Sequence, residues 1–518
     1  MYMRVLTASE AAALVRDGDT LASSGFRFAQ APEELLEAIG QRFIDTAAPQ
    51  GIRLVFSSAQ GDNAGHGLDH LAHEGLLRQV IGGFYGTTPR LRQLILDAKC
   101  EGWNLPQGQI ALLHRAIAAG HPGVVTHVGL DTFVDPRLEG GAMNARSTES
   151  FVEHLVMQGR DWLLYKAFPI NVALIRATSA DEMGNLSVER EAVRMETLAL
   201  AAAARNSGGI VIAQVGRLVR AGTIHAQRVE VPGHLVDVVV VAAHPERTHQ
   251  QTLGESFNAS YSGEIRVPAG RMPELDFGIR KVIARRAAQG LRPGMVVNLG
   301  QGMPEGIGLV AAELGLMDQL WTSFESGVIG GVPVKHVNFG VAINPVAMVR
   351  HDEQFMIYNG GGIDMSFLGF AEIDGNGSVN VSRFNGQVTG CGGFIDICMR
   401  THTLVFCGQF DAGRADVTVG DGRVDIARHG SHRKLVTKVE QITFNGRAAV
   451  EAGRRILLVT ERCVFQLRTD GWHLIEVAPG VRIREDILDK MDFAPHVGEV
   501  ATMDPHIFAR ARWTPATA

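Results

Sequence analysis

Cysteine is scarce in this sequence, with five residues among 518, and no two of them form a CxxC pair. An odd number of cysteines without that spacing indicates neither a disulfide framework nor a zinc knuckle. Long apolar runs are also missing. None approaches the ~20 residues of a membrane span, and the segment MYMRVLTASEAAALVRDGD carries charges where a signal peptide needs an apolar stretch. We therefore expect a cytoplasmic protein that does not act at a membrane.

Charge of one sign is not in excess, because 49 basic and 55 acidic residues are well mixed and give a net charge of −6. This balance provides no electrostatic footprint for nucleic acid. Ser326 lacks the GxSxG elbow of an α/β-hydrolase. His66, His70 and His73 have a spacing that suits one helical face, but no HExxH motif accompanies them, so we expect no metal site.

Glycine, in contrast, is abundant at 60 of 518 residues, above the roughly 7% of average proteins. Hydrophobic residues make up 46% and charged residues 20%, which is typical of a folded globular protein. The length predicts two or three domains. Extra glycine indicates either tight turns or loops where a ligand approaches the main chain, and composition does not separate the two.

Strand-like runs rich in branched residues alternate with helical patterns, which predicts an α/β fold with largely parallel sheets. The predicted strands span 52–58, 170–177, 209–215, 236–242, 296–300 and 455–460, and the predicted helices include 8–17, 32–43 and 277–289. The polar, glycine- and proline-containing segment 244–271 interrupts this pattern. We predict an N-terminal domain over 1–243, a linker over 244–271 and a C-terminal domain over 272–518.

The two halves are weakly alike. Each contains a helix, a strand, a glycine loop and a second helix opened by a Pro-Glu pair, at Pro32 and at Pro304. On this alignment Ala59 of the first half corresponds to Glu325 of the second. We predict two related open α/β domains, with the active site in the cleft where their glycine loops meet.

An acidic residue follows an apolar strand in the segment WTSFESGVIGGVP (321–333). Apolar and glycine neighbours make Glu325 a candidate covalent nucleophile, although a solvated loop glutamate remains open without further context. Gly392 and Gly393, in TGCGGFID, are candidate oxyanion donors. Cys391 lies between them and Gly390 with no activating histidine in the motif, which favours a small buried residue over a thiol nucleophile.

The segment VVNLGQGMPEGIG (296–308) combines a strand, a glycine loop and a helix opened by proline. This arrangement points backbone N–H groups at an anionic or polar ligand. Glu305 occupies the position where a GxGxxG fingerprint requires its third glycine, so we expect no NAD site.

Taken together, SFESGVIGG, GQGMPE and GCGGFID resemble the family I CoA-transferases. Further matching segments are GFRFAQAPEELLEAI (25–39), NLPQG (104–108), HVGLDTFVDPRLEGGAMN (127–144), VEVPGHLVD (229–237) and GVRIREDILDKMDFAP (480–495). The sequence is most similar to the single-chain acetate or propionate type, in which two subunit types are fused. The fusion accounts for the linker and for the faint duplication.

The resemblance implies a role for each matching residue. Glu325 would form an acyl-glutamyl anhydride and then a glutamyl-CoA thioester, moving CoA between short-chain acids such as acetate, propionate, butyrate or acetoacetate. Gln107 would contact the substrate carboxylate or the oxyanion, and Gly392 or Gly393 would form the oxyanion hole. The expected CoA and acyl contacts are Gly300, Gly302, Met303, Gly362 and Asn380. CoA would be a substrate, with no further cofactor or metal, and the chain would form a homo-oligomer.

The acid-binding side of the site does not transfer from the family. Distant relatives have asparagines where this chain has SSAQ (57–60), and Gln60 is our candidate replacement. The pair Phe84 and Tyr85 is either a limit on acyl length or a packed turn. Two other functions remain open: an acyl-CoA hydrolase on the same scaffold, and a sugar-phosphate isomerase or effector-binding sensor of related fold.

Overall fold

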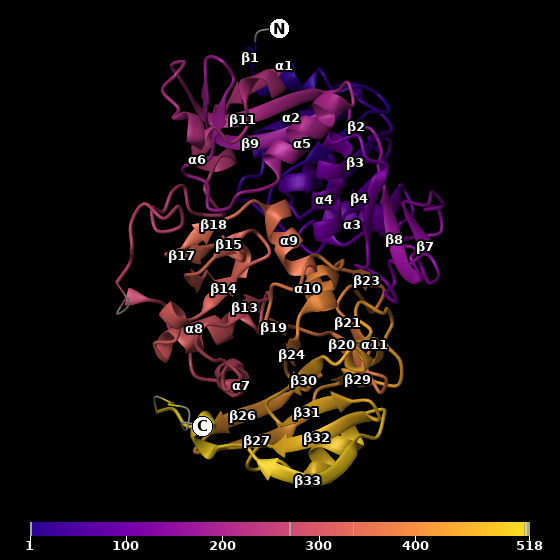
Figure 1. The fold of residues 1–518 in the computed structure, drawn as a ribbon, viewed down its shortest axis with the longest axis vertical. Helices are drawn as coiled ribbons and strands as arrows, with labels where there is room; N and C mark the ends of the chain where they lie inside the picture. The colour runs from indigo at the N-terminus through magenta and orange to yellow at the C-terminus, as the bar shows by residue number, and fades with distance from the viewer. Residues whose placement is uncertain (1–2, 269–270, 335, 512, 515–518) are drawn as a thin grey trace.

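The computed structural model describes residues 3–268, 271–334, 336–511 and 513–514. Two large sheets organise the chain (Figure 1). The first has nine strands and occupies the indigo-to-magenta part of the ribbon; the second has ten strands and occupies the part that runs from pink through orange to yellow. The predicted α/β fold with largely parallel sheets is confirmed.

The first sheet has the order β1-β12-β11-β9-β2-β3-β4-β5, with β10 beside β9. Its strands are β1 (Arg4–Leu6), β2 (Thr20–Ser23), β3 (Ile52–Phe56), β4 (Leu77–Gly82), β5 (Glu101–Asn104), β9 (Val172–Asp181), β10 (Leu186–Ser187), β11 (Ile210–Val219) and β12 (Val238–Val241). A separate three-stranded sheet contains β6 (Gly123–Thr126), β7 (Val152–Met157) and β8 (Arg160–Lys166).

The second sheet has the order β18-β15-β14-β13-β19-β24-β30-β31-β32-β33. Its strands are β13 (Val296–Leu299), β14 (Trp321–Ser323), β15 (Val328–Ile329), β18 (Ala347–Met348), β19 (Met365–Leu368), β24 (Thr403–Cys407), β30 (Arg455–Val459), β31 (Cys463–Arg468), β32 (Gly471–Val477) and β33 (His496–Thr502). Small sheets contain β16 (Val332–Pro333), β17 (Ala342–Ile343), β20 (Glu372–Asp374), β21 (Val379–Asn380), β22 (Arg383–Phe384), β23 (Gln387–Val388), β25 (Asp411–Ala412), β26 (Asp416–Gly420), β27 (Arg423–Arg428), β28 (His432–Arg433) and β29 (Leu435–Val436).

Helices cover both sheets. They are α1 (Ala8–Ala12), α2 (Glu33–Thr46), α3 (Pro89–Leu96), α4 (Gln107–Ala118), α5 (Thr197–Asn206), α6 (Pro245–Thr248), α7 (Ile279–Ala288), α8 (Glu305–Glu313), α9 (His351–Asn359), α10 (Phe394–Arg400) and α11 (Gly446–Glu451). The predicted helix 8–17 is shorter than expected, because the chain turns after α1 and reverses at Gly18, whose φ is +76°. No helix in the described ranges is long and apolar enough to cross a membrane.

The two sheets share one topology at their centres. Five strands run in the order β3-β2-β9-β11-β12 in the first sheet and β14-β13-β19-β24-β30 in the second, and every neighbouring pair is parallel. Alternate residues of these strands pack into cores on opposite faces: Leu54 on one face and Val55 on the other, for example. Burial on both faces explains why the strands read as continuous apolar runs.

The halves meet through α4 of the first, which packs against α9 and α10 of the second. The predicted linker 244–271 contains α6 and otherwise irregular chain, and its residues 269–270 lie outside the described ranges. The first sheet is built from chain before this segment and the second from chain after it. The domain boundaries themselves stay a prediction.

Candidate active site

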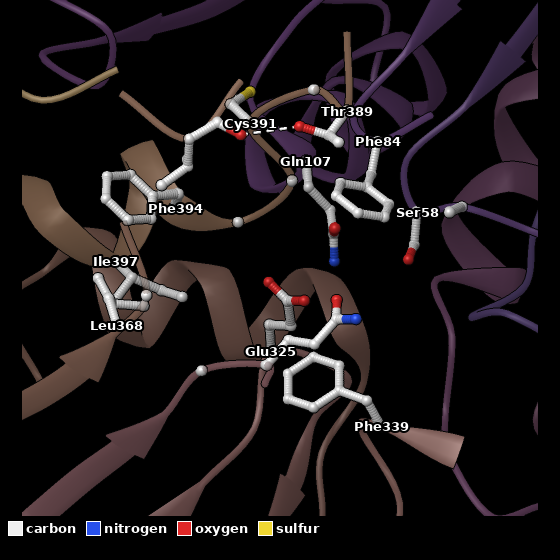
Figure 2. A pocket seen from close by; sticks show the side chains of 18 of the residues that line it. Ser58, Phe84, Gln107, Glu325, Phe339, Leu368, Thr389, Cys391, Phe394 and Ile397 are labelled. Carbon is white, nitrogen blue, oxygen red and sulfur yellow. Dashed lines mark hydrogen bonds between the residues drawn. The ribbon is translucent and has the colours of Figure 1, made fainter. Parts of the chain in front are cut away.

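A cavity of about 350 Å³ lies between the two halves, at the carboxyl ends of strands from both sheets (Figure 2). The loops after β2, β3 and β4 wall it on one side, and the ends of β13, β14 and β19 wall it on the other. The carboxyl ends of parallel strands are the usual ligand site of open α/β sheets. The lining includes Phe26, Arg27, Ser58, Ala59, Phe84, Gln107, Gly300, Gly302, Glu325, Phe339, Leu368, Gly392, Gly393, Phe394 and Ile397.

Glu325 lies two residues beyond β14, anchored by the fully buried Phe324 before it. Figure 2 shows its carboxylate pointing into the cavity, on the side that faces Gln107. Enclosure by the protein raises the pKa of Glu325 to about 6, although His351, Arg27 and the backbone N–H of Gly393 oppose the rise. The carboxylate is therefore ionised at neutral pH and more basic than an exposed one, as a nucleophile requires.

The backbone N–H groups of Gly393 and Gly392 point to different partners. The N–H of Gly393, at the start of α10, faces the Glu325 carboxylate and lowers its pKa. A Cβ at this position would lie 2.2 Å from Glu325 Oε2, so only glycine permits the approach. The N–H of Gly392 instead donates to the Gly83 carbonyl at 2.8 Å. Of the two predicted oxyanion donors, Gly393 is the one whose N–H faces the carboxylate.

Gln107 belongs to a chain of buried polar groups. Its side-chain nitrogen lies 2.8 Å from Nε2 of His351, whose Nδ1 lies 2.7 Å from Glu196. Ser57 donates a 2.6 Å hydrogen bond to the other Glu196 oxygen. Burial alone raises the pKa of Glu196, but His351, together with His114 and Ser57, lowers it to about 2. The ionised Glu196 thus fixes His351, which fixes the Gln107 amide at the cavity wall.

Four residues that the sequence placed in the binding site lie outside the cavity lining. Both ends of the Gln60 amide bond Ser23, at 2.7 and 3.0 Å. Asn380 donates to Glu372 at 2.7 Å, and its oxygen accepts from the backbone of the turn that follows it. Gly362 follows α9, and Met303 packs against the core of the second half. Gly300 and Gly302 do line the cavity.

Sequence reasoning did not single out His351, Glu196 or Arg27. Local pattern carried no signal for the first two, because they are 155 residues apart and meet only in the folded chain. Of the predicted aromatic pair, Phe84 lines the cavity, whereas Tyr85 is buried and donates to the Trp103 carbonyl at 2.6 Å.

The rejected nucleophile and metal sites have ordinary structural explanations. Burial raises the pKa of the Cys391 thiol well above its usual range, so no thiolate is present at neutral pH. His70 lies 2.8 Å from Glu33, and His66 lies 2.7 Å from Asp62. Within the described ranges, the side chains close enough to share a metal ion are Asp470, His473 and His496, at the β32–β33 surface and not in the cavity.

Comparisons with known proteins agree with this geometry. Residues 5–242 match the family model for coenzyme A transferase. The chain is 41% identical over 516 residues to the caffeate CoA-transferase of Acetobacterium woodii, covering 98% of both chains. It is 38% identical over 510 residues to the acetate CoA-transferase YdiF of Escherichia coli K12, covering 98% of this chain and 95% of that one.

The fold comparison extends the match over almost the whole chain. The acyl-CoA transferase YdiF apoenzyme of Escherichia coli O157:H7 superposes with a TM-score of 0.93 at 37% identity, covering 99% of this chain and 97% of that one. A second crystal structure of that protein, described as a thioester complex with CoA, matches equally well. Full-length identity to CoA-transferases leaves the sugar-phosphate alternative without support. This chain belongs to the CoA-transferase family, as a single-chain enzyme of family I.

Proposed function

We propose that this enzyme moves CoA between a short-chain acyl-CoA and a free carboxylic acid through covalent intermediates on Glu325. The observation that carries the proposal is the Glu325 carboxylate itself: it is enclosed in the cavity between the halves, has a pKa of about 6, and is faced by the backbone N–H of Gly393. Such a group is poorly solvated and well oriented, the two conditions for carboxylate nucleophilicity.

The reaction begins when a Glu325 oxygen attacks the thioester carbonyl of acyl-CoA. A C–O bond forms, the C–S bond breaks, and CoA leaves as a thiolate. The thiolate attacks Cδ of Glu325 in the resulting anhydride, releasing the acid as a carboxylate and forming a glutamyl-CoA thioester. A second carboxylate then runs both steps in reverse. Each intermediate is an activated acyl group, so the thioester energy is retained as long as water is excluded.

The residues around Glu325 suit this sequence of steps. The Gly393 N–H lies where negative charge develops on the oxygen of an attacked Glu325 carbonyl. Gln107, held by His351, presents its amide to the same space. The apolar side chains Leu368, Phe394 and Ile397 border the cavity beside Glu325 and keep water from it (Figure 2).

The acid we propose is small. Phe26, Phe84 and Phe339 line a cavity of about 350 Å³, which limits the space beyond Glu325. One relative is named for acetate and another for caffeate, so a substrate panel should contain acetate, propionate, butyrate, acetoacetate and caffeate. We expect kcat/KM to be highest for the short aliphatic acids. A maximum at caffeate would overturn the proposed acid class and leave the transferase mechanism intact.

The covalent mechanism has a direct test. Incubation with acyl-CoA, followed by hydroxylamine or borohydride and peptide mass spectrometry, should modify Glu325 in the wild type. Glu353→Gln, which removes a carboxylate outside the cavity, should be modified as the wild type is. An unmodified Glu325 would refute the scheme. Thiol release that proceeds without an acceptor acid would identify a hydrolase instead.

Three expectations accompany this proposal. CoA acts as a substrate and no resident cofactor or metal takes part, so dialysis against a chelator should leave the rate unchanged. The protein works in the cytoplasm, which cell fractionation tests. It forms a homo-oligomer, which light scattering after size-exclusion chromatography tests.

A further inference from the structure

Arg27 is a buried cation in the wall of the active-site cavity. Only 8% of the residue is exposed, and its guanidinium makes no hydrogen bond or ion pair with any residue that the structure describes. The guanidinium lies over the ring of Phe339, 6.0 Å from its centroid. Buried guanidinium groups are almost always paired, because removing the charge from water is costly. An unpaired one inside a substrate cavity therefore indicates an anionic ligand.

The backbone holds Arg27 firmly in this position. The residue has a φ of +55°, in the left-handed region that a non-glycine residue adopts at a cost of about 1 kcal/mol or more. Its N–H donates to the Ala59 carbonyl at 2.6 Å, and the flanking Phe26 and Ala29 exchange two 2.9 Å hydrogen bonds. The strained conformation is thus fixed by the loops after β2 and β3, as is common where a side chain must be aimed.

Two carboxylates, Glu305 and Glu325, act electrostatically on Arg27, and Glu325 lines the same cavity. Glu305 accepts hydrogen bonds from Arg280 and from the Gly302 N–H, both at 3.0 Å, and it forms no covalent bond in the proposed reaction. The Glu325 carboxylate, in contrast, is consumed in the anhydride and in the glutamyl-CoA thioester. Arg27 therefore loses a neighbouring negative charge whenever Glu325 is part of the anhydride or of the thioester.

We propose that Arg27 forms the binding site for the carboxylate of the free acid while Glu325 carries CoA. This inference rests on the proposed function and extends it to a substrate contact. In the free enzyme, one negative charge near Arg27 belongs to Glu325. In the glutamyl-CoA form Glu325 is neutral, and the incoming acid restores that charge. The same cation thus attracts the two carboxylates in turn, and the acid arrives beside the thioester that it attacks.

The phosphates of CoA are the other anions in the reaction, and the geometry disfavours them. Arg27 lies close enough to Glu325 to influence its pKa, and Glu325 must reach the thioester carbonyl. The pantetheine arm separates that carbonyl from the pyrophosphate. A group beside Glu325 therefore contacts the acyl end of the substrate.

Steady-state kinetics of Arg27→Gln separates the two half-reactions. Loss of charge-assisted hydrogen bonds should lower kcat/KM for the free acid by roughly 10- to 100-fold. The value for acyl-CoA should fall much less, because Arg27 faces an anion at the start and at the end of that half-reaction. Arg27→Lys should recover part of the loss. Arg286→Gln, which removes a similarly buried arginine outside the cavity, should change neither value.

Equal losses for the two substrates, or an unchanged value for the acid, would refute this role of Arg27. A measurement on the wild type covers the case in which the variants fail to fold. With the isolated glutamyl-CoA form, the sulfonate analogue of the acid should compete with the acid, and its neutral amide should not. Equal competition would also refute the role. If no glutamyl-CoA form can be isolated, the proposed function itself fails, which is a different result.

Discussion

The corners after β3 and β14 are the most instructive pair in the molecule. Both strands lie at the same end of the shared five-stranded parallel order, β3 beside β2 and β14 beside β13, and both lead into the cavity. After β3 the chain presents Ser58 and Ala59; after β14 it presents Glu325. The shared topology builds two similar walls, and only the wall after β14 places a carboxylate at this corner, the one we propose as the nucleophile.

The first half contributes positioning groups instead. Its sheet continues through the parallel strands β4 and β5, which carry the chain to Phe84 and to Gln107 at the start of α4. The second sheet has the short antiparallel strands β15 and β18 at the equivalent edge. The halves have diverged at their edges, so in the proposed mechanism one half provides the nucleophile Glu325 and the other provides Arg27 and Gln107, which bind the substrate.

Removing the carboxylate from the corner after β14, or moving it to the corner after β3, should cause the largest loss of activity. Glu325→Gln should lower turnover at least ~10⁴-fold, because no covalent intermediate forms. The double variant Glu325→Ala with Ala59→Glu should stay equally inactive, since the Gly393 N–H serves only the β14 corner. Transfer of CoA from acyl-CoA to acetate measures both. Recovery of activity by the double variant would show that the corners are interchangeable.

Glycine at the reactive corner should matter more than glycine elsewhere in the same cavity. Gly393 has a φ of −83°, which alanine adopts freely, so Gly393→Ala acts through the Cβ that would lie 2.2 Å from Glu325 Oε2. We expect kcat to fall roughly 10²- to 10³-fold, as when an oxyanion contact is lost. Gly369→Ala is the control, because its Cβ would meet only the Gln301 carbonyl at 4.0 Å. Similar losses in the two variants would contradict the steric explanation.

The sequence predicted the central strands well because their apolar, β-branched runs are buried on both faces. It also singled out Glu325 and Gly393, which lie within short glycine-rich motifs and both line the cavity. The contacts it missed join distant segments: His351 reaches Glu196 from another half of the protein. No local pattern distinguishes those two residues from ordinary polar positions at helix starts.

Gln60 shows a second limit of sequence reasoning. It follows Ala59, which lines the cavity, and the motif therefore suggested that its amide also reaches the substrate. Gln60 turns inward and bonds Ser23, fixing the loop instead of reading the ligand. A motif gives the location of a residue to within a few ångströms, but the direction of its side chain depends on the register of the folded chain.

The buried carboxylate of Glu325 should also lower the free energy of unfolding, whereas Ala59 at the matching corner carries no such cost. Burial raises the pKa of Glu325 to about 6 from 4.5, so the folded state binds a proton more tightly and loses stability as pH rises through this interval. Glu325→Gln should therefore stabilise the protein by about 2 kcal/mol at pH 8 and by less as pH falls toward 4.5. Denaturation with urea at both pH values measures the difference. For Ala59→Ser, the difference in the free energy of unfolding from the wild type should not depend on pH. A pH-independent difference for Glu325→Gln would contradict the raised pKa of Glu325.

His351 couples the two halves, and its loss should have the smallest effect of the four changes. His351→Gln frees the Gln107 amide and removes a group that holds down the pKa of Glu325. The rate with acyl-CoA requires ionised Glu325, so kcat/KM should decline as pH falls through about 6 in the wild type. In the variant we expect this limb to move to higher pH, with a loss of roughly tenfold in kcat/KM at its plateau.

His114→Gln is the matched control, because His114 is equally buried beside Glu196 but contacts neither Gln107 nor Glu325. A lower plateau with an unmoved limb would mean that His351 acts on Gln107 alone, and the electrostatic link between the halves would then run through Arg27.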